Sequence, residues 1–289
     1  MCKRGEKIRV VGVSRGNEYS PNHVDNDAAI LRLAAEALER MGCEVTIYPE
    51  KEFVAQNIEG EFIFDMARDR ATIERLKKLE DGGALVVNSA YGIDNCVRQQ
   101  MTELLVANEV PHPRSFIIST DEKFTPSVVP LLGFKRGNSH AMVKEDVVYV
   151  ECREEAEVVM ADFRKRNIPV AVVNEHLVGD LVKFYGVQGT NFFYTFYPTE
   201  QSHSKFGLES HQRSHERFPV RCQAASGIRQ QGSEVLNVPV YGGDCVVSAT
   251  GEIRIIDFND WPSFARCREE AGPEIAKCIY NRIIHKLEK

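Results

Sequence analysis

The sequence predicts a mixed α/β (α+β) fold that opens with a doubly wound α/β subdomain. Strand-like and helix-like segments alternate over residues 1–90, an order that is typical of a parallel sheet covered by helices. Residues 241–247 and 252–258 read as two short strands, and the small polar link between them ends in glycine, which is typical of a hairpin. A chain of 289 residues is long enough for two or three packed subdomains.

Composition and charge exclude several classes of protein. Hydrophobic residues make up 43% of the chain and charged residues 27%, which is ordinary for a globular protein. The formal net charge of −6 argues against the basic surface with which proteins bind nucleic acid. No apolar run approaches the roughly 18–20 residues that a membrane helix needs. We therefore expect no nucleic acid and no membrane as partner, and the sequence is compatible with a monomer or a homodimer.

The N-terminus and the cysteines indicate a cytoplasmic location. Residues 1–5 are charged and lead straight into an apolar strand, without the pattern of a signal peptide. The 8 cysteines are scattered and include no Cys-x-x-Cys pair, which argues against a disulfide framework and against a zinc knuckle. We expect reduced thiols that pack as small hydrophobic side chains.

The N-terminal subdomain is expected to contain four strands and two helices. Asp25 or Asn26 can cap the first helix, and Gly42 ends it as a C′ glycine does. The loop 12–23 lies at the carboxyl edge of the first strand, where doubly wound sheets bind ligands, so Arg15 is a candidate contact for an acceptor. The composition of this loop is also typical of an ordinary turn. The expected strands are 7–13, 44–48, 61–66 and 84–87, and the expected helices are 27–41 and 71–79.

The C-terminal hairpin carries the most informative polar residues. Asp244 lies on its first strand, and Asp257 and Asn259 lie two residues apart on the second, so both of these side chains point to one face. Two carboxylates and an amide oxygen suit Mg2+, which also binds the oxygens of a phosphate ligand. An isolated Asp-x-Asn is often plain turn chemistry, but this one follows the apolar run 253–256. We therefore interpret the three residues as a metal site.

The hairpin resembles the metal-binding end of the ATP-grasp superfamily. The shared pattern is Gly-Asp, an apolar strand, a glycine turn and then Ile-Ile-Asp-x-Asn-x-x-Pro over residues 255–262. The resemblance implies ATP and Mg2+ as cofactors, with the metal held by Asp244, Asp257 and Asn259. Many ATP-grasp ligases carry glutamate at the position of Asp257. The aspartate resembles more closely the inositol polyphosphate kinase branch and, more distantly, glutathione synthetase-like and ribosomal-protein-modifying ligases.

The resemblance also implies how the chain is divided. It runs from about residue 88 to the last helix and implies the ATP-grasp fold, in which two α+β lobes clasp ATP. The expected parts are an N-terminal α/β subdomain over 1–90, a central lobe over 91–175 and a C-terminal lobe with the metal site over 176–289.

Basic residues match phosphate-binding positions of the family in order along the chain. Lys135 ends a strand and is expected to reach phosphate oxygens as a point charge. Many members carry a lysine near Arg98, where this chain has an arginine followed by two glutamines. The loop 137–142 is similar to the central loop of inositol phosphate kinases, in which a histidine contacts a substrate phosphate. His140 is the matching position, and its alternative reading is an exposed loop histidine.

A hinge between the lobes follows the apolar strand 169–173. In the family its backbone groups read the adenine edge, and a nearby acid accepts ribose hydroxyls. Lys183, in the next strand, is placed to point toward the phosphates. The matching positions for the nucleotide are Asn174, Glu175, Leu177 and Asp180.

The segment 198–221 is the most polar part of the chain. Arg213 is our candidate for a contact with the acceptor, and a solvated loop is the alternative reading. His211 and His215 lie four apart, which on a helix would allow zinc binding, but no cysteine precedes Cys222 nearby.

These residues favour a phosphotransferase. The expected reaction moves the ATP γ-phosphoryl group to a small anionic acceptor, as in inositol phosphate kinases, with Lys183, Arg213 and His140 as catalytic residues. The alternative is an ATP-dependent carboxylate–amine ligase that works through an acyl phosphate. A non-catalytic nucleotide-binding module is a third class, against which the full set of metal ligands argues. The chain contains no P-loop motif.

Overall fold

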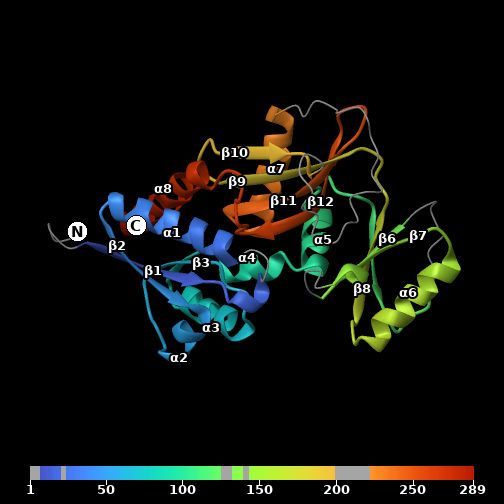
Figure 1. The fold of residues 1–289 in the computed structure, drawn as a ribbon, viewed down its shortest axis with the longest axis horizontal. Helices are drawn as coiled ribbons and strands as arrows, with labels where there is room; N and C mark the ends of the chain where they lie inside the picture. The colour runs from blue at the N-terminus through green and yellow to red at the C-terminus, as the bar shows by residue number, and fades with distance from the viewer. Residues whose placement is uncertain (1–6, 21–23, 125–131, 139–142, 199–221) are drawn as a thin grey trace.

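Three four-stranded sheets form the framework of the part of the chain that the structure describes (Figure 1). The structure is a computed structural model, and it describes all residues except 1–6, 21–23, 125–131, 139–142 and 199–221. The N-terminal sheet lies at one end of the long axis and the β5–β8 sheet at the other, with the β9–β12 sheet between them. This is the mixed α/β architecture that the sequence predicts.

The N-terminal sheet is parallel, with the strand order β2-β1-β3-β4. Asp69 caps the N-terminus of helix α3: its side chain accepts a hydrogen bond from the backbone N–H of Thr72 and so satisfies one free donor of the first turn. The elements are β1 (Ile8–Ser14), α1 (Val24–Arg40), β2 (Cys43–Pro49), α2 (Glu50–Ala55), β3 (Phe62–Asp65), α3 (Arg70–Asp81) and β4 (Leu85–Val87). The four strands and two helices predicted from the sequence are confirmed, and α2 is a short helix that was not predicted.

The last helix of the chain packs on the first. Helix α8 (Arg268–Leu287) lies along α1, and one buried cluster joins Ile30 and Leu38 to Ile279 and to Trp261 (Figure 1). Trp261 is fully buried and lies 6.0 Å from Phe64, measured between ring centroids. The N-terminal subdomain is thus completed by residues from the far end of the sequence.

The central sheet is antiparallel, with the strand order β5-β8-β6-β7. Helix α6 covers one face of it and buries Met160 and Phe163 against Phe134 and Ala171. Two helices precede the central sheet in the chain, α4 (Ala90–Asn95) and α5 (Arg98–Ala107). The elements of the sheet and its covering helix are β5 (Ser115–Ser119), β6 (Leu132–Arg136), β7 (Val147–Val150), α6 (Arg153–Lys165) and β8 (Val170–Glu175).

The third sheet is also antiparallel, with the strand order β10-β9-β11-β12. Helices α5 and α7 lie on one face, where Leu105 and Leu236 belong to the same buried cluster as Phe184 and Phe258 (Figure 1). Its elements are β9 (Asp180–Val187), β10 (Phe193–Phe196), α7 (Cys222–Leu236), β11 (Val240–Val247) and β12 (Ile253–Asp260).

A β-bulge interrupts the hairpin of β11 and β12. Asp244 pairs with Asp257, whereas the next residue, Cys245, pairs with Ile255, so Ile256 is the extra residue. Strict alternation from Ile255 would turn Asp257 toward the buried face. The bulge restores the buried face to Phe258 instead and leaves the aspartate partly exposed.

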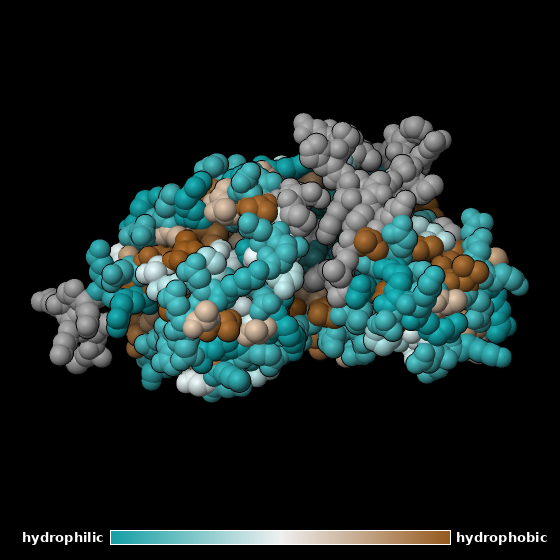
Figure 2. Space-filling model, turned by 60° about the horizontal axis from the view of Figure 1, so that its bottom comes forward, coloured by the Kyte–Doolittle hydropathy of each residue, from teal (hydrophilic) through white to brown (hydrophobic). Residues whose placement is uncertain are grey.

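The surface and the thiols agree with an ordinary globular chain. Figure 2 shows a mainly hydrophilic face with scattered apolar patches, which is normal for folded proteins. Within the described ranges, no helix is both long and apolar enough to cross a bilayer. The six described cysteines are free thiols, and all except Cys152 are buried, as expected.

Candidate active site

Three of the predicted site residues lie in one row across the third sheet. Lys183 of β9 pairs in register with Asp244 of β11, which pairs in turn with Asp257 of β12. The Lys183 Nζ atom lies 3.1 Å from Asp244 Oδ1 and 3.2 Å from Oδ2. About a quarter of each of the three side chains is exposed, so the row is open to a ligand from solvent.

Asn259 extends this row along β12. Its amide Nδ2 lies 3.5 Å from Asp257 Oδ2, which confirms that the two side chains share one face. Two register positions from the Asp244–Asp257 pair, Asn259 stands opposite Gly242, which has no side chain to cover it.

The donor set fits magnesium better than zinc. No group of three or more His, Cys, Asp or Glu side chains able to hold a metal occurs in the described residues. Two carboxylates and one amide oxygen remain, and Mg2+ typically takes one or two carboxylates together with phosphate oxygens. The ammonium of Lys183 already lies against Asp244, so this face of the sheet accommodates positive charge.

Two cations reach the row from outside the third sheet. Lys135 of β6 donates from Nζ to the carbonyl of the bulged Ile256 at 3.1 Å. Burial and the neighbouring Arg98 charge lower the pKa of Lys135 to about 8, although Asp257 and Asp244 act in the opposite direction. Lys135 therefore begins to lose its proton near neutral pH.

Arg98, at the start of α5, is the second of these cations. Only 6% of the residue is exposed, and its Nη2 atom lies 4.0 Å from Asp257 Oδ1. Its Nη1 atom donates to the carbonyl of Arg136 at 3.2 Å, which joins the helix to the end of β6.

The predicted adenine-reading residues lie around a narrow cleft between the second and third sheets. The cleft has a volume of about 30 Å³, which is room for one or two water molecules. A nucleotide base therefore needs the two lobes, or the side chains between them, to move apart. The residues that line the cleft include Lys135, Asn174, Glu175, His176, Leu177 and Tyr149.

Asn174 and Glu175 have partners within the protein. The amide of Asn174 donates to Ser115 Oγ at 2.7 Å. Glu175 accepts from the backbone and the guanidinium of Arg114 at 2.9 and 3.0 Å, and from Arg254 at 2.7 Å. Burial acts to raise the pKa of Glu175, but these bonds and charges outweigh it and lower the pKa. Glu175 thus joins the two lobes as a carboxylate.

The remaining predicted residues are not gathered with this group. Asp180 begins β9 and is 7% exposed, and the alternation along the strand groups it with the buried Val182 rather than with Lys183. His140 and Arg213 lie outside the described residues.

Sequence reasoning missed the arginines of the hinge. Arg114 and Arg254 both contact Glu175, and the two are far apart in the sequence. Arg254 alternates with the buried Ile253 and Ile255, a pattern that places it off the core face, but no spacing pairs it with the hinge.

Comparison with known proteins gives a fold rather than a close relative. No protein-family model matches the sequence, and no curated protein matches it. D-alanine–D-alanine ligase from Bacillus anthracis, solved with ATP, has a similar structure, with a TM-score of 0.69 at 10% identity over 97% of this chain and 99% of that one. The ligase from Coxiella burnetii gives 0.67 at 11% identity, over 98% and 97%.

A D-cycloserine synthetase is a third solved structure similar to this chain, with a TM-score of 0.63 at 11% identity over 95% of this chain and 99% of that one. These neighbours support the ATP-grasp part of the resemblance and do not support its inositol polyphosphate kinase branch. Over nearly its whole length, the chain therefore has the ATP-grasp fold.

Proposed function

We propose that this chain is an MgATP-dependent carboxylate–amine ligase that works through an acyl phosphate. The observation that carries the proposal is the row of Lys183, Asp244 and Asp257, which faces Lys135 and Arg98 across the contact of two lobes. Oxygen ligands for a metal beside three cations are what phosphoryl transfer requires, and this supports the proposal. The similarity to ligase structures favours a carboxylate as the acceptor.

Each residue of the row has a distinct role in the proposal. Asp244, Asp257 and Asn259 would hold Mg2+, which would supply positive charge to neutralise the phosphate oxygens. Lys183 and Lys135 contact the phosphates as point charges. Arg98 adds a third positive group, and its guanidinium is already oriented by the carbonyl of Arg136.

The chemistry proceeds in two balanced steps. A carboxylate oxygen of the first substrate attacks the γ-phosphorus, the bond to the β-phosphate oxygen breaks, and ADP leaves. The amine of the second substrate then attacks the acyl carbon, inorganic phosphate leaves, and the amine nitrogen loses a proton. Lys183 and Lys135 stabilise the charge that develops on the transferred group, a kind of contribution that is typically worth on the order of 10²–10³ in rate.

The nucleotide is proposed to enter from the cleft at the hinge. Asn174, Glu175 and Leu177 line that cleft, whereas Asp180 does not and has no part in the proposal. The division into 1–90, 91–175 and 176–289 is part of the same proposal. The Mg2+ requirement and the monomeric or homodimeric state belong to it as well.

A kinase reading has less support. Its particular residues are His140 and Arg213, and both lie outside the described part of the chain. The small anionic acceptor is common to both readings, since a carboxylate is also an anion.

The test is a trapping experiment with hydroxylamine. The purified chain is incubated with MgATP and single amino acids, beginning with D-alanine, and ADP and hydroxamate are measured. An acyl phosphate reacts with hydroxylamine to give a hydroxamate, whereas a phosphate ester does not. Hydroxamate that needs both MgATP and the carboxylate, and disappears in Asp257→Asn, supports the ligase. A stable phosphorylated alcohol as product, with no hydroxamate, would refute it.

A further inference from the structure

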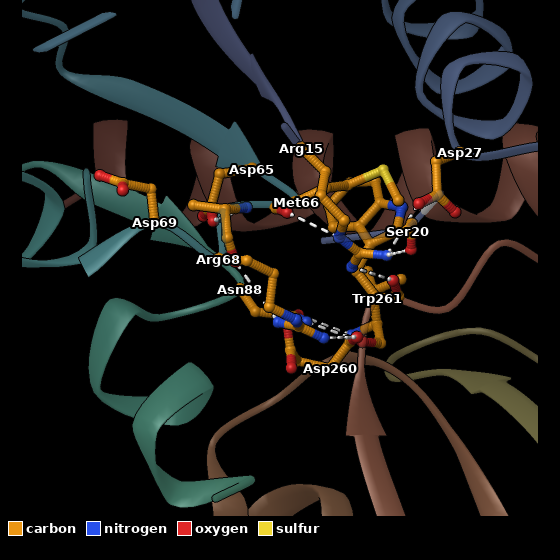
Figure 3. A network of polar contacts seen from close by, with 12 residues as sticks. Arg15, Ser20, Asp27, Asp65, Met66, Arg68, Asp69, Asn88, Asp260 and Trp261 are labelled. Carbon is orange, nitrogen blue, oxygen red and sulfur yellow. Dashed lines mark hydrogen bonds and ion pairs between the residues drawn. The ribbon is translucent and has the colours of Figure 1, made fainter. Parts of the chain in front are cut away.

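The carboxyl edge of the N-terminal sheet meets the base of the hairpin that carries the candidate metal ligands. Three side chains make this contact, and each follows the end of a different parallel strand: Arg15 after β1, Arg68 after β3 and Asn88 after β4 (Figure 3). We call these three residues the hairpin clamp. Their partners are Trp261, Asp260 and Val240.

Asn88 holds the start of β11. Its Nδ2 atom donates to the Val240 carbonyl at 2.7 Å, and its Oδ1 atom accepts from the Val240 N–H at 2.9 Å. The same carbonyl also accepts from the Trp261 N–H at 2.9 Å, so the start of one strand and the end of the other are held together. Asn88 is 1% exposed.

Arg68 holds the end of β12. Its guanidinium forms an ion pair with the Asp260 carboxylate through Nη1, and Nη2 donates to the Asp260 carbonyl at 3.3 Å (Figure 3). Asp260 is 1% exposed and directly follows Asn259. One side chain thus contacts both the side chain and the backbone of the residue beside a candidate metal ligand.

Arg15 holds the next residue. Its Nη2 atom donates to the Trp261 carbonyl at 3.1 Å, Nε donates to the Met66 carbonyl at 3.1 Å, and Nη1 donates to Asp27 Oδ2 at 2.9 Å. The side chain is only 8% exposed, so the contact with an acceptor that the loop suggested does not fit. Trp261 has a φ of 28°, which is unusual for a bulky residue and persists only where the surroundings enforce it.

Glu50 fixes the loops that carry the two arginines. Its carboxylate accepts from the backbone N–H of Gly16 at 2.5 Å, of Arg68 at 2.7 Å and of Asp69 at 2.6 Å. Glu50 is 1% exposed. The arginines therefore project from backbone that is itself held in place.

The position of β12 in its sheet explains why such a clamp has consequences for the metal site. β12 is an edge strand in the described part of the chain, bonded to β11 on one side, and its ladder is interrupted by the bulge at Ile256. The backbone from 257 to 259 is held on one side by its pairing with β11 and by the buried Phe258, so contacts from outside the third sheet reach this segment at its two ends. Lys135 contacts the bulge at one end, and the clamp contacts Asp260 and Trp261 at the other.

We propose that Arg68 and Arg15 are positioning residues, which set Asp257 and Asn259 in the geometry that binds Mg2+ by holding Asp260 and Trp261. The inference rests on the proposed function, because it takes the hairpin as the metal site. It adds that the carboxyl edge of the N-terminal sheet holds β12, the strand that carries Asp257 and Asn259. Loss of the clamp lowers metal affinity although no metal ligand is changed.

The test measures Mn2+ as a substitute for Mg2+. Binding of Mn2+ in the presence of a non-hydrolysable ATP analogue is followed by electron paramagnetic resonance for wild type, Arg68→Lys and Arg68→Ala. Outer-shell substitutions typically cost about 10- to 100-fold in metal affinity. We expect a loss in that range for Arg68→Ala. A smaller loss is expected for Arg68→Lys, since lysine retains the charge but not the two-pronged contact.

The matched control is Arg166→Ala in the central lobe. Arg166 also forms an ion pair with a fully buried aspartate, Asp146, and its partners among the described residues, Asp146, Asp162 and Phe163, lie outside the hairpin. We expect this variant to melt at a lower temperature and to bind Mn2+ like wild type. Hydrogen exchange of the amides of 257–261, measured without metal or nucleotide, should be faster in Arg68→Ala and unchanged in the control.

The outcomes separate the two proposals. If wild type binds no Mn2+ with the analogue, the proposed function fails, and the positioning role fails with it. If wild type binds Mn2+ and both Arg68 variants bind it as tightly as wild type does, at a temperature at which they are folded, only the positioning role is overturned. An equal loss in Arg166→Ala would also overturn it, because the effect would then follow general stability.

Discussion

Asp257 and Asp260 lie on the same strand, yet their carboxylates have opposite surroundings. Asp257 is a quarter exposed, stands in register with Asp244 and lies 4.0 Å from the Arg98 guanidinium. Asp260 is 1% exposed and is closed into an ion pair with Arg68. An open carboxylate can exchange its partners for a metal, whereas a closed one fixes the strand. The comparison teaches that one short segment both presents ligands and anchors them.

The largest effect is expected from breaking the closed pair. Asp260→Asn leaves the Arg68 guanidinium without its carboxylate in a site that is mostly shielded from water. Removing one partner of a buried pair typically costs 3–5 kcal/mol, and for a chain of this size each 1 kcal/mol lowers Tm by about 2–4 °C. We expect a fall in Tm of about 10 °C, measured by differential scanning calorimetry. A Tm within 2 °C of wild type would show that the closed pair is not the anchor.

Substitution of the open carboxylate, Asp257, should lower activity and not Tm. Asp257→Asn is expected to retain the Tm of the ligand-free protein more closely than Asp260→Asn, because the Asp257 side chain is a quarter exposed, whereas that of Asp260 is 1% exposed. It should lose ADP formation by a factor on the order of 10²–10³, since a charge that contacts the phosphate-bound metal is removed. Measurement of Tm and ADP release on the same preparations checks both. A large fall in Tm would remove the contrast between the two aspartates.

The third prediction concerns how Tm depends on pH through the buried carboxyl group of Asp65. Burial raises the pKa of Asp65 to about 8, so the folded state holds a proton that the unfolded chain releases near pH 4. The stability linked to this proton is complete below about pH 4 and is lost as the pH rises through 8. Each pKa unit corresponds to about 1.4 kcal/mol. We expect Tm of wild type to fall between pH 6 and 8.5 by several degrees more than Tm of Asp65→Asn, and parallel curves would contradict this.

The smallest expected effect is the pH dependence of nucleotide affinity that arises from Lys135, which lies beside the open carboxylate of Asp257. Its pKa of about 8 means that the free site loses positive charge as the pH rises from 7 to 9. Phosphates favour the charged form, so the bound lysine has the higher pKa and the affinity for the ATP analogue should fall above pH 8. A decrease of up to about tenfold by pH 9 is expected in calorimetric titrations. Lys135→Arg, which remains charged, should bind with less dependence on pH.

Much of the fold could be predicted because its signals are local. The apolar strands and the glycine that ends the hairpin turn appear within a few residues of one another, and so does the Asp257-x-Asn259 spacing. The structure confirms the hairpin and the shared face of these two side chains. Alternation alone, however, would have turned Asp257 toward the core, because the pattern gives no sign of the bulge at Ile256.

The role of Arg15 could not be predicted from its loop. Its loop is at the carboxyl edge where doubly wound sheets bind ligands, and that position suggested an acceptor contact. The edge is instead occupied by the hairpin of the third sheet, and Arg15 donates to Trp261, 246 residues away. The kinase interpretation drew on similarly local evidence, from single motifs, whereas the D-alanine–D-alanine ligases share the fold of nearly the whole chain.

The sequence by itself determined the mixed α/β class, the order of strands and helices and the oxygen-rich hairpin. These follow from side-chain periodicity and turn chemistry, which act over a few residues. Only the tertiary structure decided which side chains became anchors. The contacts of Arg68 with Asp260 and of Asn88 with Val240 span 192 and 152 residues, and no spacing along the chain encodes such pairs. They arise because the whole fold brings the edge of one sheet against the end of another.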